Sequence, residues 1–224
     1  GQVIAQALAA AYRTVDNRLC HSLHAYFIRP GDPSIPVIYQ VDRARDGGSF
    51  TTRRVVAIQH GKQILNVSAS FHIQDEGWDH HHEMPQMEDP ESYPSRTELR
   101  KKYVDLVPKH MRGELTRERP IEVREASHLD PFHPEKSDDR NQVWFRMPGA
   151  AGADSATQQL LLTYASDMYL MGSGMRPHGL SWVTGQVNGA SLEHAMWFHA
   201  PSHFENWHLY SMDSPWSGRG RNFN

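Results

Sequence analysis

The side chains best able to bind a metal are the 15 histidines of this 224-residue chain. A zinc site needs several ligands that converge on one point. Three consecutive histidines at 80–82 fan out on any regular backbone, and a proline between His199 and His203 opposes the helix that their spacing would need. His21 and His24 are expected on opposite faces of a strand. We therefore expect solvated loop histidines and neither a metal nor a cofactor.

Nucleophilic chemistry also has little support among the serines and the sole cysteine. Because Cys20 is the sole cysteine, an intrachain disulfide and a Cys-rich zinc module are excluded, and we expect a buried or half-buried thiol at the start of a strand. Gly172-Ser173-Gly174 lacks the GxSxG pattern of a nucleophile elbow and is interpreted as a turn that ends a helix. Phosphate-binding loops of the Walker or GxGxxG type are absent, because Gly218-Arg219-Gly220 stands alone.

Asp167 is the one carboxylate in the apolar segment LLLTYASDMYLM. Its neighbours have the spacing of a helix, which we predict over residues 155–170. Periodicity alone favours a solvent-facing position for Asp167. An earlier helix, predicted over 1–15, has no carboxylate along its body. An acid in only one of two such helices fits a duplicated fold that retains one functional site.

Several antiparallel strands surround these helices. Short apolar runs between residues 20 and 73 are separated by Pro, Gly and Asp turns, and they predict an antiparallel meander with a hairpin at His60-Gly61. Residues 75–95 are polar and acidic without periodicity, so they are interpreted as an exposed linker. A short charged helix is predicted over 96–106, and strands are predicted over 120–125 and 143–146.

An internal repeat relates the two halves of the chain. His24-Ala25 is matched by His194-Ala195, aromatic residues follow both pairs, and Pro30 and Pro201 close the two segments. Each copy contains elements that the other lacks. We therefore expect the given chain to lack strands at both ends, and to begin within a helix that is already under way.

Composition excludes two classes of partner. The formal net charge is −3, with 23 basic and 26 acidic residues, which gives no basic excess for binding nucleic acid. No run approaches the ~18 apolar residues that a membrane span needs. We expect a soluble protein with neither nucleic-acid nor membrane partners.

Blocks over nearly the whole chain resemble the acyl-CoA thioesterase II family. They include GQVIAQAL, HSLHAYFIRPGDPSIPVIYQVDRARDGGSFTTRRV, RPIEVRE, LLLTYASDMYL and ASLEHAMWFHAP, and they stand in the family's order. The resemblance implies an α+β double hotdog, in which two antiparallel sheets each wrap a central helix. The expected division is an N-terminal hotdog at 1–75, a linker at 76–118 and a C-terminal hotdog at 119–224.

The resemblance also implies hydrolysis of acyl-CoA to a fatty acid and CoA. The family holds a water beside the thioester with an Asp, a Thr or Ser, and a Gln. The Asp falls on Asp167 and the hydroxyl residue on Ser191, which would otherwise be interpreted as a turn or strand-start residue. The Gln belongs to a QEG motif that does not occur before Asn224. Homo-oligomers and a cytoplasmic location are expected, with a peroxisomal address left open.

Two other functions use the same fold and substrate. One is an acyl-CoA-binding module that does not hydrolyse its ligand. The other is hydration of an enoyl thioester, which would lower the substrate's absorbance without releasing a thiol. Release of free thiol from a panel of acyl-CoAs separates both of these from thioester hydrolysis.

Overall fold

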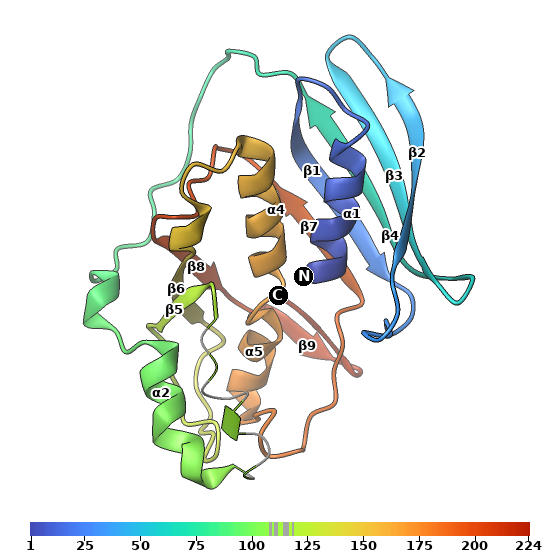
Figure 1. The fold of residues 1–224 in the computed structure, drawn as a ribbon. Coiled ribbons are helices and arrows are strands. Elements are labelled where there is room, and N and C mark those ends of the chain that lie inside the picture. The colour runs from blue at the N-terminus through green and yellow to red at the C-terminus, as the bar shows by residue number, and fades with distance from the viewer. Residues whose placement is uncertain (108, 110–111, 114–116, 118) are drawn as a thin grey trace. The chain divides into compact units, whose positions relative to one another are not determined.

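The computed structural model describes residues 1–107, 109, 112–113, 117 and 119–224 (Figure 1). The remaining residues, all within the predicted linker 76–118, lie outside the described part. The chain forms two compact units. The first contains residues 1–80, 152–168 and 190–202, and the second contains residues 81–151, 169–189 and 203–224.

Unit 1 is built on a five-stranded antiparallel sheet in the order β2-β3-β4-β1-β7. Its strands are β1 (Leu19–Phe27), β2 (Ile38–Asp46), β3 (Phe50–Gln59), β4 (Lys62–His72) and β7 (Glu193–Trp197). The hairpin at His60-Gly61 is confirmed: both residues have positive φ, 48° and 68°, as the two central residues of a type I′ turn require. The predicted meander therefore forms most of this sheet.

Helix α1 (Gln2–Tyr12) lies against the sheet and fills the core of unit 1 (Figure 1). The helix buries residues at the spacing of a single face, and the strands supply their alternate inward residues. These buried residues include Ile4, Ala7, Leu8 and Ala11 from the helix and Leu23, Val55, Val67 and Phe71 from the sheet. A sheet wrapped around one helix is the hotdog arrangement.

Helix α4 (Ser155–Ser166) packs beside α1 in the same unit. Asp154 caps its first turn by accepting from the backbone N–H of Thr157. The helix ends at Ser166, four residues before the predicted end at residue 170. Tyr169 adopts a left-handed backbone with φ of 69°, which a helix cannot continue through, and the shorter helix α5 (Leu170–Met175) follows.

A polar contact joins the two helices to β1. The hydroxyl of Tyr12 donates to Oε1 of Gln159 and accepts from the backbone N–H of Cys20 at 2.8 Å. The amide nitrogen of Gln159 donates to the carbonyl oxygen of Cys20 at 2.9 Å. These bonds satisfy polar groups in the interior of unit 1, where an unpaired group would be costly.

Strands β1 and β7 correct two sequence interpretations. His24 pairs with Ala195 and Ala25 pairs with His194, so His24 is exposed on the outer face while His194 is buried on the inner face. The matched His-Ala pairs are therefore not equivalent in the fold. A β-bulge at 20–22 also brings His21 to the outer face, where it contacts Ser70, so His21 and His24 share a face.

Unit 2 contains smaller sheets and short helices. A three-stranded antiparallel sheet has the order β5-β6-β8, and β9 pairs with β10. The bounds are β5 (Glu122–Glu125), β6 (Asn141–Arg146), β8 (His208–Met212), β9 (Trp216–Gly218), β10 (Arg221–Phe223), α2 (Arg96–Tyr103) and the 3₁₀ turns Pro90–Ser92, Val104–Leu106, Pro148–Ala150 and Arg176–His178. Gly172-Ser173-Gly174 lies inside α5, so its interpretation as a turn is wrong.

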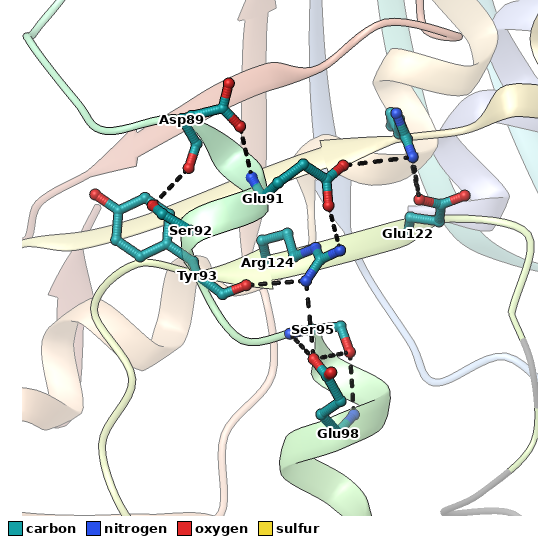
Figure 2. A network of polar contacts seen from close by, with 9 residues as sticks. Asp89, Glu91, Ser92, Tyr93, Ser95, Glu98, Glu122 and Arg124 are labelled. Carbon is teal, nitrogen blue, oxygen red and sulfur yellow. Dashed lines mark hydrogen bonds and ion pairs between the residues drawn. The ribbon is translucent and has the colours of Figure 1, made fainter.

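Arg124 on β5 fixes the segment that leads into α2 (Figure 2). Its guanidinium donates to the carbonyl oxygen of Tyr93 at 3.0 Å and pairs with Glu91. Ser95 and Glu98 form a capping box at the start of α2, each side chain accepting from the other's backbone N–H. Ion pairs and hydrogen bonds to Arg124 therefore hold the segment before α2 to the sheet of unit 2, and Leu99 of α2 is buried.

Among the described residues, no helix is both long enough and apolar enough to cross a membrane.

Candidate active site

Asp167 lies at the C-cap of α4, in unit 1. Its side chain is only 18% exposed, and the nitrogen of Gly1 donates to its Oδ2. The solvent-facing position favoured by periodicity is therefore wrong, because the helix on which that periodicity rests ends one residue earlier. The carboxylate faces the start of α1 instead.

A glycine is needed where α1 begins. A Cβ added at Gly1 would overlap the backbone carbonyl of Tyr164, near the end of α4. The absence of a side chain therefore lets the first turn of α1 approach the end of α4 closely. This approach brings the positive end of the α1 dipole next to Asp167.

Ser191 lies two residues before β7 and contacts Asp167. Its hydroxyl donates to Oδ1 of Asp167 at 3.1 Å. The segment is held to the sheet by the backbone N–H of Phe27, which donates to the carbonyl oxygen of Leu192 at 2.9 Å. The structure thus brings together both residues that the family resemblance singled out, although 24 positions separate them in the chain.

His194 is a third polar residue at this place, and sequence reasoning did not assign it to the site. Its side chain is buried on the inner face of β7, where Nε2 lies 2.9 Å from the hydroxyl oxygen of Ser166 and Nδ1 lies 4.0 Å from Oδ1 of Asp167. Burial lowers the pKa of His194, and the nearby Asp167 carboxylate opposes that effect. Strand alternation places residue 194 on the inner face only once the exposure of Trp197 is known from the structure.

The arrangement suits activation of a water molecule. Gly1 donates to Oδ2 of Asp167 and Ser191 donates to Oδ1. A carboxylate can accept about four hydrogen bonds, so acceptor positions remain on both oxygens. Asp167 can therefore also accept a hydrogen bond from water and take its proton as a general base. Ser191 donates to Asp167 and keeps its lone pairs for the second hydrogen of the same water.

Other places in unit 1 are less suited to this chemistry. Cys20 is 1% exposed, and burial raises the pKa of its thiol to about 12, which confirms the expected buried thiol. A hollow of about 720 Å³ lies over the exposed face of β2 and β3, at the opposite edge of the sheet from β7. Over the described part of the chain, no three His, Cys, Asp or Glu side chains are grouped to hold a metal ion.

Two family profiles match the chain. Residues 1–72 match the profile described as acyl-CoA thioesterase N-terminal domain, and residues 111–224 match the one described as acyl-CoA thioesterase. The chain is 35% identical to acyl-CoA thioesterase 2 of Haemophilus influenzae over 223 residues, which cover 98% of this chain and 78% of that protein.

Solved structures give the same result. The fold is similar to that of an acyl-CoA thioesterase II from Mycobacterium marinum, with a TM-score of 0.78, 36% identity, and coverage of 98% of this chain and 78% of the other. A conserved protein with a hot dog fold from Alicyclobacillus acidocaldarius matches 98% of this chain and 76% of its own, with a TM-score of 0.69 at 18% identity. These similarities confirm the α+β double-hotdog fold expected from the sequence.

Proposed function

This chain belongs to the acyl-CoA thioesterase II family and hydrolyses acyl-CoA; from that premise we propose that Asp167 and Ser191 hold the attacking water. The observation that supports the proposal is the hydrogen bond of 3.1 Å from the Ser191 hydroxyl to Oδ1 of Asp167. This bond fixes a carboxylate and a hydroxyl side by side. A water that donates one hydrogen to each presents its free lone pair to the thioester carbonyl carbon.

The reaction then follows from the chemistry of these groups. The water oxygen forms a bond to the carbonyl carbon while Asp167 takes a proton from that water. The tetrahedral intermediate collapses with cleavage of the C–S bond, and the proton on Asp167 passes to the departing CoA sulfur. The products are a fatty acid and CoA, and Asp167 returns to its ionised form.

The first turn of α1 supplies the group that stabilises the developing negative charge. The helix has Gly1 as its N-cap, and no side-chain cap bond forms there among the described residues. Backbone N–H groups at the start of a helix can donate to an oxyanion, and the helix dipole favours negative charge there. We assign the thioester oxygen to this place.

The finer organisation is also a proposal. We keep the division into hotdogs at 1–75 and 119–224 with a linker at 76–118; the two family profiles, at 1–72 and 111–224, support two copies joined by an intervening segment, and the second profile begins within that linker. A homo-oligomer is supported by exposed Tyr26, Phe50 and Trp197 on unit 1, and a monomer mass by light scattering would contradict it. A cytoplasmic location stays a proposal with a peroxisomal one as its alternative, and cell fractionation distinguishes the two.

Two substitutions of Ser191 test the water-holding pair. Ser191→Ala removes the hydroxyl, and we expect kcat for acyl-CoA hydrolysis to fall by about 10- to 100-fold, because the carboxylate loses its donor and the water loses an acceptor. Ser191→Thr keeps the hydroxyl and should retain most activity. Release of free CoA thiol measures both. Equal activity of the Ala variant and the wild type would remove Ser191 from the mechanism.

A further inference from the structure

His194 occupies a core position where the first copy of the repeat has an apolar residue. Aligning Tyr26-Phe27 with Trp197-Phe198 and Pro30 with Pro201 makes Leu23 the counterpart of His194. Both side chains are on the inner face of their strands, and Leu23 is fully buried. Burying an imidazole where a leucine would fit is unfavourable unless the ring is hydrogen-bonded. The residue therefore calls for an explanation beyond packing.

The counterpart of the acid differs in the same way. The C-cap of α1 is Arg13, whereas the C-cap of α4 is Asp167. The histidine and the carboxylate thus occur together in the second copy, where Nδ1 of His194 lies 4.0 Å from Oδ1 of Asp167. The second copy therefore differs from the first at two positions that lie close together in the fold.

The contacts of Ser166 are the basis on which we assign the proton of His194 to Nε2. A hydroxyl has one hydrogen, and that of Ser166 is donated to the carbonyl oxygen of Thr163 at 3.0 Å. The same oxygen lies 2.9 Å from Nε2 of His194, and in our assignment it accepts from an Nε2–H. In the neutral ring, Nδ1 is then a bare acceptor that faces Asp167.

An acceptor at this position favours the protonated form of Asp167. Against the ionised carboxylate, the Nδ1 lone pair makes no hydrogen bond, in agreement with the separation of 4.0 Å. Once Oδ1 carries a proton, a rotation of the carboxyl group lets that O–H donate to Nδ1. A hydrogen bond made to the neutral form of an acid raises its basicity.

We propose that His194 is a positioning residue for the hydrolysis: its Nδ1 receives the hydrogen bond of Asp167 after the carboxylate has taken the proton of the attacking water. The inference rests on the proposed role of Asp167. Because the bond forms only as the proton is transferred, it lowers the barrier of the chemical step and leaves substrate binding unchanged. Loss of this hydrogen bond should therefore lower kcat and leave KM unchanged.

The proposal carries a pH dependence with a definite sign. Burial lowers the pKa of His194 and the Asp167 carboxylate opposes that effect, while the neighbours on β1 are the apolar Leu23 and Ala25. The ring is therefore neutral at pH 7. Below its pKa, Nδ1 becomes a donor that stabilises the ionised carboxylate and weakens it as a base. Activity should fall as pH drops through the pKa of His194.

Two substitutions separate this role from a structural one. His194→Leu restores the residue of the first copy and suits the core, so thermal stability should be maintained while kcat falls about 10-fold or more with KM within about twofold. His194→Asn leaves a cavity but places an amide oxygen close to the position of Nδ1. It should be less stable than the Leu variant and more active. A structural role predicts the opposite order.

The control and the pH profile complete the test. His24→Leu changes the exposed member of the matched His-Ala pairs and should leave kcat unchanged. In His194→Leu, the acid limb of the kcat profile should move to lower pH. Ser166→Ala removes the acceptor of the Nε2–H and should lower kcat several-fold. This variant replaces His194→Leu in the test if the Leu variant does not fold. Asp167→Asn is measured in parallel.

The outcomes are distinguishable. The role of His194 alone would be overturned if a folded His194→Leu or Ser166→Ala variant kept the wild-type kcat and the wild-type acid limb of the pH profile while Asp167→Asn was inactive. An active Asp167→Asn would overturn the proposed water-holding pair instead. Loss of kcat with unchanged KM, partial recovery in His194→Asn and a shifted acid limb would support the inference.

Discussion

At the scale of single residues, burial decides which side chains can act. Asp167 keeps 18% of its side chain exposed and has acceptor positions to spare, whereas Cys20 is 1% exposed. Desolvation disfavours the thiolate, which is the reactive form of cysteine. The acid is thus placed to meet water, and the thiol is not.

Cys20 should therefore be inert in the folded protein. Burial raises the pKa of its thiol to about 12, so almost no thiolate is present near pH 8. A disulfide reagent should give no reaction with the native chain and one equivalent after unfolding, since the sequence has one cysteine. Rapid reaction of one equivalent with native protein would contradict the described burial. The same experiment gives the background for thiol-release assays.

The site was only partly predictable from its residues. Family resemblance selected Asp167 and Ser191, and the structure joins them by a hydrogen bond. Periodicity placed Asp167 in solvent because it could not detect the left-handed backbone of Tyr169, a conformation rare for any residue but glycine. His194 was missed because the matched His-Ala pairs suggested an equivalence that strand register removes.

At the scale of elements, a network of side-chain hydrogen bonds connects the two helices of unit 1. Its contact on α4 lies away from the end of the helix that carries Asp167. Tyr12 bonds Gln159 and the backbone of Cys20, so α1, α4 and β1 share one hydroxyl. Gly1 and Tyr164 fix the other end of the helix pair. The position of the site therefore depends on contacts at both ends of α1.

Removing that hydroxyl should destabilise the protein. Tyr12→Phe leaves the amide of Cys20 and the side chain of Gln159 without this partner, and we expect a loss of about 1–2 kcal/mol in the free energy of unfolding. Tyr39→Phe is the matched control, because its hydroxyl bonds Gln6 at the exposed surface. That change should stay within about 0.5 kcal/mol. Denaturant unfolding compares the two, and equal effects would argue against the network.

Elements were more predictable than their boundaries. The meander and its turn at His60-Gly61 follow from turn residues and alternation, which are local signals. The end of α4 and the bulge near His21 depend on tertiary contacts, which override local preference. The unit boundaries likewise depend on long-range pairing: β7 joins β1 across about 170 positions of the chain.

At the scale of the whole molecule, the described part of the duplicated fold brings an acid, a hydroxyl and the start of α1 together in unit 1. Asp167 and Ser191 come from the second copy, and the helix start comes from the first. At the corresponding helix end, the first copy has Arg13 in place of the acid. We therefore expect one active site per chain, assembled from both copies in unit 1.

The central claim is tested most directly by Asp167→Asn, with free CoA thiol as the readout. One site per chain predicts that this single change lowers kcat by about 10²- to 10⁴-fold, the range that a general base contributes, in a protein with unchanged thermal stability. Asp154→Asn at the other end of α4 is the matched control and should keep wild-type activity, because Asn also caps helices well. Half or more of the activity remaining in folded Asp167→Asn would contradict the account.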